Sequence, residues 1–200
     1  MVLVTCEDPG ALSSSNEGDS RPYSKMMEFP LIEPGDFQEA KDMTKWDFEL
    51  SEEIHNLVMV RSVTRMSHAA GNVEIGALPE RTITARYVYD SHLMDQMAGP
   101  AATAVVCPQR LRQHAAVKKA VALFEDSPFN TYNGPSNPEL LVITSSAATF
   151  YCKEAVDILD IKDRVGILKL GTTWPLPPKL LKKHLASTGN VLVVEEGTPF

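Results

Sequence analysis

The chain has 200 residues, of which 44% are hydrophobic and 22% are charged, and its formal net charge is −7. This composition predicts an ordinary soluble globular chain of one or two domains and excludes fibrous and disordered classes. The negative charge argues against a nucleic-acid partner, because binding to phosphate backbones needs Lys and Arg gathered on one face.

Targeting signals and metal motifs are not evident in the sequence. No apolar segment approaches the roughly 20 residues of a membrane span, and the first residues lack the basic start of a signal peptide. We therefore expect a cytoplasmic protein with no membrane partner. Cys6, Cys107 and Cys152 lack the paired spacing of a metal site, so we expect buried, reduced thiols and no bound metal.

The first part of the chain alternates strands and helices. Residues 2–5 form a continuous β-rich run that is typical of a buried parallel strand, and residues 57–63 form a second one. Between them, residues 19–27 predict a short helix and residues 30–32 a short extended piece. Asp36, with Glu39 three residues later, resembles a capping pair that opens a helix running to Ile54.

These elements predict a β-α-β part of a parallel sheet. Two convincing strands are too few to complete such a sheet, so we expect the chain to begin within a domain. The regular signal then weakens from residue 73 to residue 129. Residues 80–89 mix β-branched and charged side chains, and residues 109–124 regain helical spacing. We interpret this region as a connecting arm.

A second α/β unit follows the turn-rich residues 127–135. Strands are predicted over residues 140–144, 165–170 and 191–194. A helix lies between the first two, and Pro177 or Pro178 opens another before the third. The order β-α-β-α-β predicts a small, doubly wound parallel unit.

Two loops follow strands of the first unit, and in a parallel sheet such loops meet at one edge, where ligands bind. The first loop offers hydroxyl, amide and charged groups: Ser13, Ser14, Ser15, Asn16, Glu17, Asp19 and Arg21. The second offers Thr64, Arg65, Ser67 and His68. Turn formation and helix capping account for the same residue types, so composition alone leaves a ligand role open.

The two loops also carry a family resemblance. DPGALSSSNEGDSR, residues 8–21, resembles the DPG-x-x-SSQNEQD-S/N-R signature of the alpha subunits of indolepyruvate:ferredoxin oxidoreductases. The resemblance continues through LIEPGDFQEAKDMTKWDFELSEE, TRMSHAAGNVEIG, LKLGTTWPLPPKLL and VLVVEEGTPF, in the family's order and spacing. It therefore covers nearly the whole chain.

The resemblance implies an α/β fold in three parts. Residues 1–75 correspond to the C-terminal half of a domain that binds the aminopyrimidine of thiamine diphosphate. Residues 76–135 correspond to a connecting arm, and residues 136–200 to a small doubly wound domain like the C-terminal domain of transketolases. The glutamate that activates the pyrimidine lies upstream of this region in the family.

The family reaction is the oxidative decarboxylation of aryl pyruvates such as indolepyruvate to acyl-CoA, with ferredoxin as electron acceptor. The resemblance thus implies a 2-oxoacid and CoA as substrates, a beta subunit and ferredoxin as partners, and an oligomeric assembly. Thiamine diphosphate with Mg²⁺ is held partly by a further domain, and iron–sulfur clusters lie in a C-terminal region. We expect this chain alone to be inactive and to bind no cofactor tightly.

Site residues carry over at matching positions. The resemblance implies that the cofactor is bordered by Ser13, Ser14, Asn16 and Glu17. It implies that Arg65 and His68 face the substrate, where Arg65 offers a fork to a 2-oxoacid carboxylate.

Three positions in the first loop depart from the family pattern. Leu12, Ser15 and Gly18 stand where the pattern has His, Gln and Gln, so polar groups have shrunk or vanished there. Two other interpretations stay open. One is a non-catalytic interaction or structural module with the same α/β folds, and the other is a piece of a different thiamine-dependent enzyme.

Overall fold

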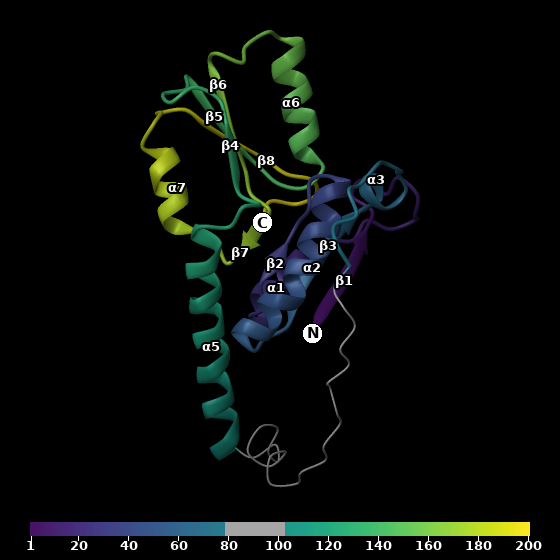
Figure 1. Cartoon of the computed structure of the whole chain (residues 1–200), viewed down its shortest axis with the longest axis vertical. Coiled ribbons are helices and arrows are strands. Elements are labelled where there is room, and N and C mark those ends of the chain that lie inside the picture. The colour runs from purple at the N-terminus through teal and green to yellow at the C-terminus, as the bar shows by residue number, and fades with distance from the viewer. Residues whose placement is uncertain (79–102) are drawn as a thin grey trace.

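The computed structural model describes residues 1–78 and 103–200, apart from the side chains of residues 103–108. The predicted irregular stretch at residues 80–89 and the side chain of Cys107 lie outside this description. Two four-stranded sheets, each with helices packed on it, lie one above the other in the view of Figure 1. The predicted α/β fold class is confirmed.

The first sheet is mostly parallel and has the strand order β1-β3-β2-β7. The inner strand next to β1, which is β3 (Val58–Val63), is buried along nearly its whole length, as a strand covered on both faces must be. The first part of the chain contributes β1 (Val2–Glu7), α1 (Arg21–Met27), β2 (Leu31–Ile32), α2 (Phe37–Ile54), β3 (Val58–Val63) and α3 (Thr64–Ser67).

The capping pair predicted for α2 forms in part. The Asp36 carboxylate accepts a hydrogen bond of 2.8 Å from the Glu39 N–H, as the spacing predicts. The Glu39 carboxylate, however, accepts from the N–H of Gly35 at 2.8 Å instead of returning to Asp36. It also contacts the ammonium of Lys169, which belongs to the second sheet.

The second sheet has the order β4-β6-β5-β8, in which β6, β5 and β8 run parallel and β4 is antiparallel to β6. The predicted three-stranded unit therefore gains a fourth strand. The second part of the chain contributes α5 (Thr103–Glu125), β4 (Thr131–Asn133), β5 (Leu140–Thr144), α6 (Ala148–Ile158), β6 (Val165–Lys169), β7 (Thr172–Trp174), α7 (Pro178–Leu185) and β8 (Val191–Val194).

β7 belongs to the first sheet, although it follows β6 of the second sheet directly in the chain. Leu31 and Ile32 of β2 pair antiparallel with Trp174 and Thr172 of β7. The first sheet is therefore completed by residues from the second part of the chain. The division at residues 75 and 135 stays a prediction.

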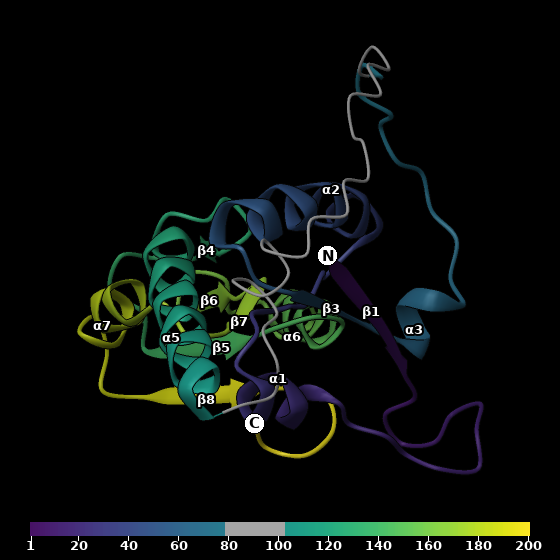
Figure 2. The same cartoon turned by 90° about the horizontal axis from the view of Figure 1, so that it is seen from below.

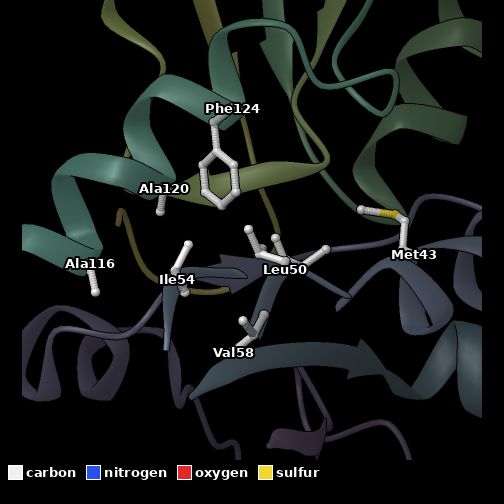
Figure 3. Close-up of a cluster of buried hydrophobic side chains, with 8 residues drawn as sticks. Met43, Leu50, Ile54, Val58, Ala116, Ala120 and Phe124 are labelled. Atoms are coloured by element: carbon white, nitrogen blue, oxygen red, sulfur yellow. The ribbon is translucent and has the colours of Figure 1, made fainter. Parts of the chain in front are cut away.

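The helix α5 is longer than the predicted residues 109–124 and is packed into the core (Figure 3). Ala120 and Phe124 of α5 are fully buried beside Leu50 of α2 and Val58 of β3. In Figure 2, α5 lies between α7 and the helices of the first sheet. The region interpreted as a connecting arm thus supplies part of the hydrophobic core.

β1 forms an edge of the first sheet in the described part of the chain, so the buried strand predicted from residues 2–5 is instead partly exposed. Leu3 is 41% exposed and Val4 57%. The prediction of buried thiols is wrong for Cys6, which is exposed at an edge that no strand of the described residues covers. Cys152 is half-buried, and burial raises the pKa of its thiol. No helix within the described residues is long and apolar enough to cross a membrane.

Candidate functional site

The carboxyl ends of β1 and β3 form an open pocket of about 320 Å³. The two strands are parallel neighbours, with Glu7 opposite Val63, so the loops that follow them meet as predicted. The pocket is lined by both loops and the strand ends: Cys6, Glu7, Asp8, Ser13, Ser14, Asn16, Gly18, Thr64, Ser67 and His68.

Asp8 organises the first loop. One carboxylate oxygen accepts hydrogen bonds from the N–H groups of Ser13 and Ser14 at 2.6 and 2.7 Å. The other accepts from the Thr64 hydroxyl at 2.6 Å. The Thr64 hydrogen bond, supported by the contacts from Ser13 and Ser14, holds the pKa of Asp8 well below its usual range. The sequence alone did not single out Asp8 for this role.

The predicted cofactor residues divide into two groups. Ser13, Ser14 and Asn16 line the pocket, and all three are exposed. Glu17 is not among the lining residues, and its carboxylate accepts from the Gly10 N–H at 3.1 Å, which closes the loop on itself. Gly18, one of the positions that depart from the family pattern, also lines the pocket.

The predicted substrate residues, Arg65 and His68, also differ in their surroundings. His68 follows α3, lines the pocket and is exposed. Arg65 is not among the lining residues. Its Nε lies 3.3 Å from Oε1 of Glu196, and its guanidinium lies 5.2 Å from the ring centre of Tyr151 on α6. The structure therefore brings His68, but not Arg65, together with the serine loop.

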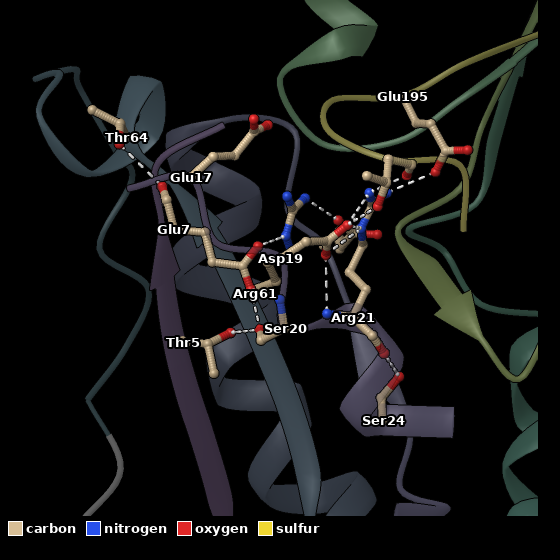
Figure 4. A network of polar contacts seen from close by, with 12 residues as sticks. Thr5, Glu7, Glu17, Asp19, Ser20, Arg21, Ser24, Arg61, Thr64 and Glu195 are labelled. Carbon is tan, nitrogen blue, oxygen red and sulfur yellow. Dashed lines mark hydrogen bonds and ion pairs between the residues drawn. The ribbon is translucent and has the colours of Figure 1, made fainter. Parts of the chain in front are cut away.

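A buried charge network supports the pocket from beneath (Figure 4). Arg61 of β3 is 1% exposed and forms ion pairs with the carboxylates of Glu7 and Glu33. The other oxygen of Glu7 accepts from the Ser20 N–H at 2.7 Å, so the end of the loop is held as well. Burial alone would lower the pKa of Arg61, but Glu33 and Glu7 raise it.

Sequence reasoning missed Glu7 and Arg61 as part of the site. The available signal is a charged residue inside a strand that is otherwise apolar. A buried arginine needs partners, and the residue at the end of the neighbouring strand is a natural one.

The pocket lining combines hydroxyl, amide and imidazole groups with the carboxylates of Glu7 and Asp8, which already have partners in Arg61, Ser20, Thr64 and the loop N–H groups. Serine hydroxyls and the Asn16 amide both donate and accept hydrogen bonds. No Lys or Arg is among the lining residues, so nothing there matches a diphosphate. Within residues 1–78 and 103–200 there is also no cluster of His, Cys, Asp and Glu suited to a metal ion.

Curated relatives match the chain from end to end, although no family model matches it. The IorA subunit of indolepyruvate oxidoreductase from Thermococcus kodakarensis is 37% identical over 201 residues, which cover 99% of this chain. The IorA subunits of Pyrococcus horikoshii and Archaeoglobus fulgidus are 36% and 35% identical over 199 residues each, with 100% of this chain covered. The resemblance to the indolepyruvate oxidoreductase alpha subunit is confirmed. The chain spans 30–31% of the length of these IorA relatives.

Solved structures resemble the fold at low sequence identity. A 2-oxoglutarate:ferredoxin oxidoreductase from Magnetococcus marinus has a TM-score of 0.55 at 14% identity, covering 82% of this chain and 34% of that protein. A split-gene transketolase has a TM-score of 0.53 at 12% identity, covering 98% and 48%. The fold is thus the α/β type found in transketolases and 2-oxoacid oxidoreductases, as the sequence of this IorA-like chain predicts.

Proposed function

We propose that the chain is part of a thiamine-dependent oxidoreductase subunit and that its pocket borders the aminopyrimidine of thiamine diphosphate. One observation carries this proposal. Parts of the two segments that resemble the family signatures, from Asp8 to Gly18 and from Thr64 to His68, form the walls of a single pocket whose hydroxyl, amide and imidazole groups lie beside the carboxylates of Glu7 and Asp8. The identity to IorA subunits supports the oxidoreductase class.

The reaction we propose is the oxidative decarboxylation of an aryl pyruvate, such as indolepyruvate, to acyl-CoA with ferredoxin as acceptor. When bound, thiamine diphosphate supplies the carbanion and electron sink. The residues of this chain bind and orient the cofactor and the substrate. Ser13, Ser14 and Asn16 hold the aminopyrimidine ring, and His68 faces the reacting groups. Arg65 lies outside the pocket and contacts Glu196, but its side chain is 49% exposed, and in our proposal its guanidinium also reaches the 2-oxoacid carboxylate.

Residues outside this chain complete the enzyme in our proposal. They hold the diphosphate and Mg²⁺, because the pocket offers no cation and no metal cluster within the described residues. A beta subunit, iron–sulfur clusters and an oligomeric, cytoplasmic assembly belong to the same proposal. Accordingly, magnesium and thiamine diphosphate should stabilise this chain alone by less than a few degrees in a thermal-shift measurement.

The test uses the full-length subunit with its partner and the variant Asn16→Ala. We expect weaker binding of thiamine diphosphate and lower turnover, because a pocket hydrogen bond is lost. Asn72→Ala, at an exposed asparagine outside the pocket, is the matched control. Unchanged cofactor affinity and turnover in Asn16→Ala would contradict the proposal. Arg65→Ala should raise KM for the 2-oxoacid more than it lowers kcat.

The exposed edge of β1 favours a second candidate function, that of an interaction module without catalysis. Leu3 and Val4 are exposed along a strand whose outer edge pairs with no strand among the described residues, and such an edge can take up another strand. The same experiment separates the two candidates. An assembly that forms normally but binds no thiamine diphosphate would favour the module.

A further inference from the structure

Two adjacent glutamates after β8 each contact an arginine from the first part of the chain. Oε2 of Glu195 accepts a hydrogen bond of 2.6 Å from Nη1 of Arg21. Oε1 of Glu196 lies 3.3 Å from Nε of Arg65. Neither arginine lines the pocket, but each is attached to a different wall, since Arg21 ends the first loop and Arg65 lies on α3 beside Thr64 and Ser67.

The Arg21 contact fixes the end of the first loop (Figure 4). Arg21 is 1% exposed, and its Nε and Nη2 donate to the Asp19 carboxylate at 2.9 and 2.6 Å. Its Nη2 also donates to the carbonyl of Thr198 at 2.6 Å, and the ring of Phe200 lies 5.4 Å from the guanidinium. Burial would raise the pKa of Asp19, but Arg21 lowers it, so the pair remains ionised at neutral pH.

The backbone around Glu195 and Glu196 is shaped to receive Arg21. Gly197 has φ +97°, a conformation that other residues rarely adopt. A Cβ at this position would lie 3.2 Å from Nη2 of Arg21. A glycine directly after the two glutamates therefore lets the chain turn over the guanidinium.

We propose that Glu195 and Glu196 are positioning residues for the candidate cofactor pocket. They hold the first loop through Arg21 and α3 through Arg65, so the second sheet sets the separation of the two walls. The claim that the two glutamates set the separation of the walls, the geometric part of the inference, is independent of the ligand. The claim that this separation affects cofactor binding rests on the proposed function. In this proposal, residues near the start and near the end of the sequence together position the pocket.

Hydrogen exchange of this chain tests the geometric part, with the double variant Glu195→Gln/Glu196→Gln. We expect the amides of residues 9–19 and 64–68 to exchange about tenfold faster or more, because glutamine removes the charge from the Arg21 hydrogen bond and from the Arg65 ion pair. The amides of β5 and β6 should keep their rates. Glu139→Gln, which removes the charge of an exposed ion pair with Arg164 in the same sheet region, is the control.

Two results would overturn the inference. Either the two loops keep their exchange rates, or all amides accelerate equally, as a general loss of stability would produce. Glu195→Asp restores the charge and should return part of the protection of residues 9–19.

Binding of thiamine diphosphate with magnesium to the full-length subunit tests the consequence. The double variant should bind with an affinity lower by about tenfold, and Glu139→Gln should bind like the natural protein. Equal affinity in all three would remove the positioning role. If the natural full-length subunit itself binds no thiamine diphosphate, the proposed function fails, while the exchange result still decides the geometric part.

Discussion

The hydroxyl of Thr64 donates a hydrogen bond of 2.6 Å to the carboxylate of Asp8 and so joins the ends of two parallel strands. The second oxygen of the same carboxylate holds the N–H groups of Ser13 and Ser14. One side chain thus ties the first loop both to itself and to α3. The conformation of the pocket depends on Asp8 more than on any residue predicted to bind the cofactor.

Asp8→Asn should loosen the loop, because the amide has only one oxygen acceptor and turns a donor toward the remaining donors. We expect lower protection of the Ser13 and Ser14 amides in hydrogen exchange. The lowered pKa of Asp8 means that its contribution is present above the unfolded-state value near 3.8 and is lost only as pH falls through the lowered value. The natural loop should therefore remain protected at pH 4.5. Asp42→Asn, on the surface of α2, should leave the loop unchanged.

Asp47 on α2 is fully buried, and neither carboxylate oxygen has a hydrogen-bond partner within the described part of the chain. Burial raises the pKa of Asp47 to about 8. Between the unfolded value of 3.8 and this value, the unfolded state releases a proton that the folded state keeps. The free energy of unfolding should therefore fall as pH rises through this interval.

Asp47→Asn removes this dependence. Relative to the natural chain, the variant should gain roughly 3–5 kcal/mol of stability between pH 4 and pH 8. Urea unfolding at several pH values measures the gain, and Glu49→Gln on the exposed face of the same helix is the control. If the difference in unfolding free energy between Asp47→Asn and the natural chain stays constant with pH, Asp47 is ionised in the folded state.

Arg61→Met leaves the buried carboxylates of Glu7 and Glu33 without their cation. We expect a loss of about 3–5 kcal/mol, the usual cost when one partner of a buried ion pair is removed. The triple variant Glu7→Gln/Glu33→Gln/Arg61→Met should lose less, because no charge is then stranded. Chemical denaturation compares the stability of the two variants, and a triple variant less stable than the single one would contradict this account.

Phe124→Ala tests the packing of α5. Phe124 is fully buried, and its ring centre lies 6.1 Å from that of Trp46 on α2. The cavity should cost about 3–5 kcal/mol of unfolding free energy. Leu111→Ala, at a residue of the same helix that is 68% exposed, should change stability by less than about 0.5 kcal/mol. Similar values for both would mean that α5 is not docked in solution.

Local patterns were sufficient to predict much of this fold. The β-rich runs of β1 and β3, the Asp36 cap and the alternation of strands with helices all appear where the periodicity places them. Their parallel arrangement then brings the loop after Glu7 next to Thr64, so the position of the pocket also follows from the sequence.

Contacts across long stretches of sequence could not be predicted in this way. Arg21 and Glu195 are separated by 174 positions, and no local pattern links them. The three residues of β7 are too few to show a period, and their partner strand is set by tertiary packing. The pairing of Arg65 with Glu196 is also set by tertiary packing, and it gives Arg65 a partner outside the pocket.

The position of β7 limits how this protein can be divided or recombined. A shortened version ending near residue 135 would lack the strand that pairs with Leu31 and Ile32, so its first sheet would end in an uncovered β2. Exchange of the second half with that of a relative would replace one strand of the first sheet at the same time. The sequences of the two halves must therefore change together, and any chimera needs a β2 and a β7 that can pair.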